Sequence, residues 1–180
     1  LFNKPKEEAG KGYLRIDKSL FFYDPGVGKW ERRTERERIG GTDSRRNDFD
    51  ESRLAEEYTA KWLADEKLGK FEVHKLRLEA KPGEDVAYPV LQMWIDKATG
   101  NLMKQEEYAL SGKLMRTSFY PKWKKLFSPT KNAEVYFPGE IRIFDEVEKG
   151  NSTTIVFQDV KLDPLDDAIF TKAWLEARSR

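Results

Sequence analysis

Residues 88–120 read YPVLQMWIDKATGNLMKQEEYALSGKLMRTSFY, a succession of three β-strand patterns separated by two turns. The first turn contains Thr99 and Gly100, and the second contains Ser111 and Gly112. Glycine adopts positive φ angles without steric cost, so it suits the tight turns between antiparallel strands. We therefore predict an antiparallel meander over these residues.

The first strand of this meander carries apolar side chains on both of its faces. Leu91, Met93 and Ile95 alternate onto one face, and Val90 and Trp94 onto the other. An antiparallel sheet with one face in water would instead alternate apolar and polar residues. Part of the meander is thus covered on both faces, or it lines a cavity.

Further strand patterns, rich in β-branched and aromatic residues, flank the meander at residues 13–23, 71–80, 135–144 and 152–162. In the second of these, the apolar phase slips by one residue between Val73 and Leu76, which predicts a β-bulge there. Together these patterns predict about eight to ten antiparallel strands in one large meandering sheet.

Four segments have other patterns. Asp50 or Ser52 could cap a helix that ends near Glu57, and from Leu54 onward the apolar spacing fits either a helix or a strand; we predict a short helix followed by a strand. Residues 29–39 suit an exposed strand or a short solvated helix. Residues 121–131 indicate a loop or a crossing segment. Residues 167–177 predict a short terminal helix with Ile169, Phe170 and Trp174 facing inward.

Composition limits the possible classes of protein. A chain of 180 residues favours one domain, and its 33 basic and 32 acidic residues give a formal net charge of +1. The net charge is therefore too small for the electrostatic field of the whole protein to favour binding to nucleic acid or to an anionic membrane. The absence of cysteine excludes disulfides, thiolate metal ligands and a cysteine nucleophile. No segment resembles a secretory signal or reaches the ~18 apolar residues of a transmembrane helix.

Candidates for catalysis are few. His74 is the only histidine, it lies in the middle of a predicted strand, and a single histidine is a poor basis for a zinc site. Glu106 and Glu107 are adjacent, so in a strand they point to opposite faces, and we interpret both as solvated. We predict no catalytic residue, no metal site and no cofactor, and therefore no enzyme.

The only basic cluster includes Arg32, Arg33 and Arg36, between which acidic residues alternate. This alternation favours a solvated, ion-paired strand. The alternative function for these three arginines is docking to an acidic protein partner, rather than to nucleic acid.

The remaining candidate site is apolar and spread over successive strands. If one face of the sheet is incompletely filled, it could enclose an apolar chain, and flexible methionines suit variable apolar shapes. The alternative is an ordinary core packed under a helix. The candidate cavity residues are Leu91, Met93, Ile95, Met103, Met115, Phe119, Ile141 and Ile143.

The meander also resembles a stretch of the outer-membrane lipoprotein-sorting proteins, a LolA-like family of periplasmic carriers. The resemblance rests on Trp94, Asp96, Lys97, Gly100, Glu106, Tyr108, Gly112, Lys113, Arg116 and Thr117. Residues 4–29, 40–58 and 162–176 are similar to further segments of that family. Within residues 40–58 this chain departs from the family pattern, because extra residues separate Asp43 from Phe49 and Asn47-Asp48 intrude.

This resemblance implies an α+β, mostly β fold: a curved antiparallel half-barrel with a few short helices covering its concave face. Residues 1–180 would form a single LolA-like domain, which lacks the N-terminal helix and first strands of the family. The implied function is a periplasmic carrier, which holds lipoprotein acyl chains or lipid during transport to the outer membrane and does no chemistry. An inner-membrane transporter would supply the cargo, and a lipid anchor could precede Leu1. The alternative is a periplasmic sensor or scaffold of the same fold that docks a protein partner.

Overall fold

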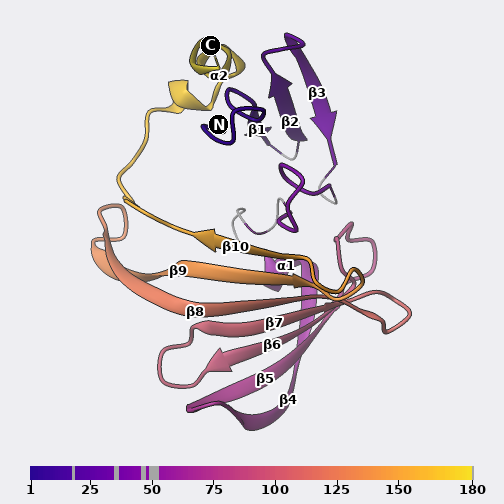
Figure 1. The fold of residues 1–180 in the computed structure, drawn as a ribbon. Coiled ribbons are helices and arrows are strands. Elements are labelled where there is room, and N and C mark those ends of the chain that lie inside the picture. Colours follow the sequence, from indigo (N-terminus) through magenta and orange to yellow (C-terminus); the bar gives the residue numbers. More distant parts are fainter. Residues whose placement is uncertain (18, 35–36, 46–47, 49–52, 180) are drawn as a thin grey trace.

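The chain forms two antiparallel sheets in a computed structural model, which describes residues 1–17, 19–34, 37–45, 48 and 53–179 (Figure 1). The smaller sheet has the order β1-β2-β3, formed by β1 (Gly12–Ile16), β2 (Ser19–Asp24) and β3 (Lys29–Arg33). The prediction of a single large sheet is therefore wrong, because these first strands pair with one another and the later strands build a second sheet.

The larger sheet has seven strands, which lie side by side in the order in which they occur along the chain. It curves strongly but does not close, since β4 and β10 form its two edges (Figure 1). The predicted fold class, a curved antiparallel sheet with a few short helices, is confirmed. The strands are β4 (Tyr58–Leu68), β5 (Phe71–Ala80), β6 (Val90–Asp96), β7 (Leu102–Tyr108), β8 (Leu114–Ser128), β9 (Ala133–Asp145) and β10 (Ser152–Val156).

The described helices are short. The helix α1 (Leu54–Glu57) leads directly into β4, as predicted. The predicted capping residues Asp50 and Ser52 lie outside the described residues. The 3-10 helix η2 (Asp167–Phe170) and the helix α2 (Lys172–Arg178) both contact β1 of the smaller sheet, rather than covering the concave face of the larger one. None of the helices in the described ranges is long and apolar enough to cross a membrane.

The terminal helix is interrupted because Thr171 caps a new one, its hydroxyl accepting a hydrogen bond from the Trp174 backbone N–H at 3.2 Å. This break changes which side chains face inward. Leu175 is the buried residue of α2, whereas Phe170 is 52% exposed, so the predicted inward position of Phe170 is wrong.

Two irregularities of the large sheet differ from the expected ones. A bulge occurs in β4, where Leu63 is the extra residue between the pairs Trp62–Leu76 and Ala64–Lys75. The bulge predicted in β5 is wrong: this strand pairs regularly with β6, and Val73 and Leu76 point to its opposite faces.

The segment predicted as a loop after residue 120 is instead the second half of β8. Pro121 is tolerated there because the register of β8 on β9 shifts between Phe119 and Lys122. At such a shift the missing proline N–H removes no regular ladder hydrogen bond.

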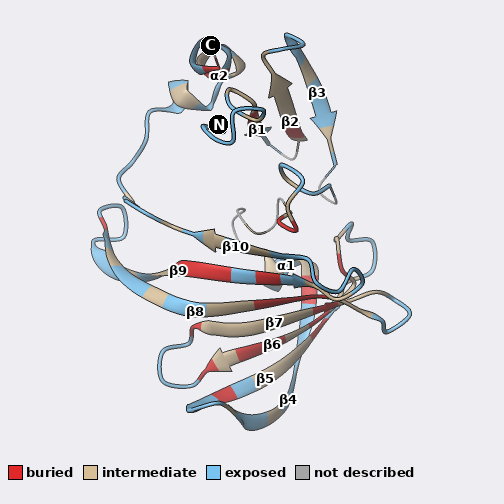
Figure 2. Cartoon of the chain, in the orientation of Figure 1, coloured by how far each residue is buried: buried red, intermediate tan, exposed pale blue. Residues whose placement is uncertain are grey.

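The main apolar cluster lies on one face of the large sheet and is formed by Tyr58, Leu78, Tyr88, Leu91 and Met93. Leu54 of α1 packs against it. We call this the inner face, and the opposite face, which carries Trp94, the outer face. Figure 2 shows buried residues along β6 and in the middle of β9, while most of β4 and the second half of β8 are exposed or half-buried.

Candidate functional site

The inner face of β5 and β6 is apolar. The strand register places Leu76 opposite Met93 and Leu78 opposite Leu91, so these four side chains form one continuous patch. At its edge the Tyr58 hydroxyl donates a hydrogen bond to the Tyr88 carbonyl oxygen at 2.8 Å. The set that includes Leu91 and Met93 therefore faces the interior, and the set that includes Trp94 faces outward.

The same face becomes charged at the next two strands. Glu107 lies opposite Leu91, and Arg116 lies opposite Glu107; both are buried. The Arg116 guanidinium donates to both carboxylate oxygens of Glu107, and to Asp48 Oδ2 and Oδ1 at 2.9 and 2.8 Å. This pair of two-pronged contacts fixes the planar guanidinium between two carboxylates.

Burial of Arg116 by itself would lower the pKa of its guanidinium, but Glu107 and Asp48 outweigh burial and raise that pKa above its ordinary value. Arg116 is therefore cationic at every physiological pH. Nearby, burial and then the negative charges of Asp48 and Glu107 raise the pKa of Tyr120. The phenol stays neutral, so this side chain offers no general base at neutral pH.

A covering segment, residues 37–45, is attached to this charged half of the inner face. Arg38 pairs with Asp145 at 2.5 Å and with Asp43 at 3.3 Å. The Thr153 hydroxyl donates to Asp43 Oδ2 at 3.0 Å and accepts from the Asp43 backbone N–H at 2.9 Å. The cover is thus held to β9 and β10 by polar contacts, not by apolar packing.

A small pocket of about 150 Å³ lies between the cover and the sheet. Apolar and charged groups share its wall, which is formed by Arg38, Asp43, Arg45, Tyr88, Met115, Arg116, Asp145, Val147 and Glu148. Ligand pockets for drug-sized molecules are typically about 300–1,000 Å³. A larger ligand would therefore require this face to open.

Ser118 is the next inner-face residue after Arg116 along β8. It is 1% exposed, and its Oγ has no hydrogen-bond partner among the described residues. Buried hydroxyls are nearly always paired, so an orphaned one calls for an explanation. It lies between Gln105 of β7 and Ile143 of β9, in the middle of the inner face.

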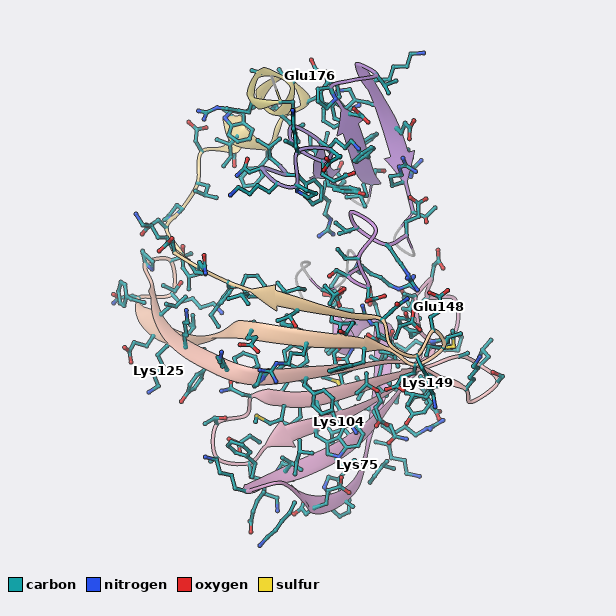
Figure 3. The ribbon with its side chains drawn as sticks, in the orientation of Figure 1. Lys75, Lys104, Lys125, Glu148, Lys149 and Glu176 are labelled. Atoms are coloured by element: carbon teal, nitrogen blue, oxygen red, sulfur yellow. The ribbon has the colours of Figure 1, made fainter. Side chains whose placement is uncertain are left out.

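The outer face carries aromatic rings covered by lysines. Lys75 and Lys104 place their Nζ atoms 4.7 and 4.3 Å from the centroid of the Trp94 ring, and both lie on the same side of the sheet (Figure 3). Lys104 also pairs with Glu106 at 2.5 Å. In such cation–π contacts the lysine stems cover the apolar ring while their ammonium groups stay in water, which stabilises an aromatic side chain at a solvated surface.

A wider, open groove of about 490 Å³ follows on the same outer face, with Phe119 and Phe144 packed edge to face and their centroids 5.9 Å apart. Phe119 therefore lies on the opposite face from most of the other predicted cavity residues. The groove has a mixed wall, in which Lys104, Glu106, Thr117, Glu146 and Lys149 join these aromatic side chains.

The structure brings most of the predicted cavity residues to the inner face. Leu91 and Met93 belong to the apolar cluster, and Ile95 and Met115 pack against it. Ile141 and Ile143 are buried on β9. Met103 lies in β7, where the register on β6 shifts between Trp94 and Ile95. Whether these residues bind a ligand stays a prediction.

The paired glutamates are correctly assigned to opposite faces, but the interpretation of both as solvated is wrong. Glu107 is buried against Arg116, and the side chain of Glu106 is largely covered, with its carboxylate bonded to Lys104 and Tyr108. The sequence analysis did not identify Arg116 and Glu107 as a buried ion pair. These two residues lie on neighbouring strands, and their common partner network includes Asp48, which is 68 residues away from Arg116 along the chain.

The other sequence candidates lie elsewhere. His74 is exposed and its Nδ1 lies 2.6 Å from Asp65, which also binds Lys97; no metal-binding group of three His, Cys, Asp or Glu side chains occurs among the described residues. Arg33 pairs with Glu31 and Glu37 at 2.6 and 3.4 Å, and Arg32 is exposed on β3. Arg36 lies outside the described residues.

Comparison with known proteins places this geometry in context. A family model described as "Uncharacterized protein" matches residues 1–177. No curated protein matches the sequence.

Three solved structures share the fold. A DUF1329 family protein from Desulfovibrio piger superposes with a TM-score of 0.85 at 19% identity, over 97% of this chain and 75% of the other. A putative outer membrane lipoprotein-sorting protein domain from Vibrio parahaemolyticus gives 0.83 at 20% identity, over 98% and 75%. A LolA superfamily protein from Nitrosomonas europaea gives 0.77 at 23% identity, over 96% and 74%. The resemblance noted in the sequence is thus confirmed at the level of the fold.

The buried charge network predicts an asymmetric response to mutation. Arg116→Met leaves the Glu107 and Asp48 carboxylates buried without their cation, and we expect it to lower the free energy of unfolding by about 3–5 kcal/mol. Arg142→Met, which removes a half-exposed arginine from Glu140, should cost no more than about 1 kcal/mol. Urea denaturation measures both. An Arg116 variant as stable as the Arg142 variant would contradict the network described above.

Proposed function

We propose that this chain, which belongs to the protein family whose model matches residues 1–177, is a carrier. The proposal is supported by its fold, which is that of a LolA superfamily protein. It holds acyl chains of a lipid or lipoprotein against the inner face of the large sheet. The proposal treats residues 1–180 as a single LolA-like domain located in the periplasm. Its cargo would come from an inner-membrane transporter and leave toward the outer membrane.

The observation that carries this proposal is the division of the inner face. One half is apolar, from Leu78 to Met93, and the other half is polar and charged, with Arg116 and Ser118 at its centre. An amphiphile has the same division: its acyl chain would bury apolar area, worth roughly 25 cal/mol per Å². Its polar end would meet the unpaired Ser118 hydroxyl, since the N–H donors of Arg116 are already bonded to Glu107, Asp48 and the Asp43 carbonyl oxygen.

The cover explains how such a ligand could enter. Residues 37–45 are held to the sheet through Arg38, Asp43 and Thr153, and through the hydrogen bond from Arg116 to the Asp43 carbonyl oxygen. Because the Asp43 and Asp145 side chains are largely buried, the cover opens only when water or a polar group of the ligand replaces these partners. Met93 and Met115 have the flexible side chains that can adapt to a chain entering between cover and sheet.

The alternative function, a periplasmic sensor or scaffold, is favoured by one observation. The inner pocket is only about 150 Å³, which is compatible with a closed interior that never binds cargo. In that case Arg32, exposed on β3, and the half-buried Arg33 would dock an acidic protein partner, together with Arg36.

Mass spectrometry of solvent extracts distinguishes the two functions. We expect natively purified protein, after denaturation, to release about one equivalent of a diacyl or triacyl lipid. Wild-type protein refolded without lipid serves as the matched blank. If the purified protein releases no lipid, and still releases none after incubation with lipid vesicles or lysophospholipid, the result supports the sensor or scaffold.

Ser118 provides a more local test. Ser118→Ala removes a buried hydroxyl without a partner, so it should leave the free energy of unfolding unchanged or increase it. If the hydroxyl binds the polar end of the cargo, the same variant should weaken binding of a fluorescent lysophospholipid by about 2–13-fold. Ser152→Ala, on the exposed edge strand β10, is the control and should change neither quantity. Unchanged affinity in Ser118→Ala would remove Ser118 from the site.

A further inference from the structure

Beyond the seven-stranded sheet, β8 and β9 continue as a two-stranded ribbon. Residues 122–128 of β8 pair with residues 133–140 of β9, whereas the pairing of β7 on β8 stops at Phe119. The pairing of β10 on β9 begins only at Glu140. The ribbon, residues 122–138, therefore projects from one end of the sheet, where Figure 1 shows the hairpin of β8 and β9 curling away from its neighbours.

The base of the ribbon is fixed to the rest of the molecule. The Trp123 indole N–H donates to the Leu102 carbonyl oxygen at 3.0 Å. Phe137 packs edge to face on Phe157, with their centroids 5.2 Å apart. These two contacts fix the orientation of the ribbon relative to the large sheet, so the same side chains stay exposed on it.

The composition of the ribbon differs from that of the chain. Residues 121–138 read PKWKKLFSPTKNAEVYFP, with four lysines, four aromatic residues and one acid, Glu134. The four lysines minus Glu134 leave three positive charges, and Lys122 is paired with Glu140, which leaves two. The whole chain, by contrast, has a formal net charge of only +1.

The aromatic and basic side chains lie together. Lys125 is opposite Tyr136, with its Nζ 5.5 Å from the ring centroid, and Phe127 follows on the same face of the ribbon. Phe127 and Tyr136 are 58% and 41% exposed. Lys125 is labelled in Figure 3 at the end of the sheet from which the ribbon projects.

Single exposed aromatic residues are ordinary on soluble proteins. Here, however, two exposed rings share one rigid ribbon with lysines and a single acid. Aromatic rings with a polar tip sit at the headgroup level of a bilayer, and lysines extend to bind its phosphates. A second copy of the same ribbon would instead bring like charges together.

We propose that this ribbon docks the protein onto the surface of an anionic lipid bilayer, with Phe127 and Tyr136 in the interface and Lys125 and Lys131 toward the headgroups. The docking does not depend on cargo binding at the inner face, so each can fail without the other. The small net charge of the whole chain is compatible with docking, because four lysines and a single acid gather locally in this ribbon.

Vesicle co-sedimentation tests the proposal with the full chain. We expect binding to vesicles of phosphatidylcholine with 25% phosphatidylglycerol, weaker binding to pure phosphatidylcholine, and loss of binding as salt is raised. Lys125→Gln with Lys131→Gln should weaken binding by about 25-fold, taking about fivefold per lysine. Lys61→Gln with Lys70→Gln, at exposed positions near the opposite edge, is the charge-matched control and should change it less than twofold.

The aromatic contribution is separated by a second pair of variants. Phe127→Ser with Tyr136→Ser should weaken vesicle binding at least tenfold, whereas Leu165→Ser with Phe170→Ser, equally exposed outside the ribbon, should not. Circular dichroism and the melting temperature check that each variant is folded. The proposal is overturned if the wild type does not bind anionic vesicles, if the ribbon variants bind like their controls, or if they instead abolish self-association or capture of an acidic protein.

Discussion

The ion pairs of Arg116 connect the two features on which the candidate site depends, the curved sheet and its cover. The guanidinium lies on the inner face of β8, it is paired with Glu107 on the neighbouring strand, and it reaches Asp48 and the Asp43 carbonyl oxygen in the chain that precedes the sheet. A buried arginine is costly unless its donors are satisfied, so the position of the cover and the charge of the inner face are set together. The same contact divides that face into an apolar half and a polar half.

This division gives the open sheet a possible use. A sheet of seven strands that does not close must cover its concave face in some other way, and here α1 and residues 37–45 contribute to that cover. Polar contacts hold residues 37–45 to the charged half of the inner face, whereas apolar side chains pack the other half, so the two halves are held by different forces. The carrier proposed above relies on that difference, and the membrane ribbon would place such a carrier at the surface from which an amphiphile comes or to which it goes.

Local patterns predicted the elements well where the signal was local. The meander and the helix that leads into β4 follow from turn residues and from the period of apolar side chains. The bulge in β4 did not follow, because the apparent phase slip in β5 has another cause: Val73 is buried on the face of a regular strand opposite to Leu76. Pro121 indicated a loop, and only the register shift on β9 explains why the strand continues.

The site was harder to predict, since it depends on contacts between distant residues. Phe119 belonged to the same apolar pattern as Met115, yet a bulge between Glu107 and Tyr108 sends the two to different faces. Arg116 appeared only as a residue of the family resemblance, and its buried partners Glu107 and Asp48 became visible only in three dimensions. The most direct test of the carrier is NMR of the three methionine methyl groups, labelled with ¹³C, during titration with a lysophospholipid. The account predicts that Met93 and Met115 shift in saturable fashion at the inner face; methionine signals that stay unchanged while the lipid remains free in solution would contradict it.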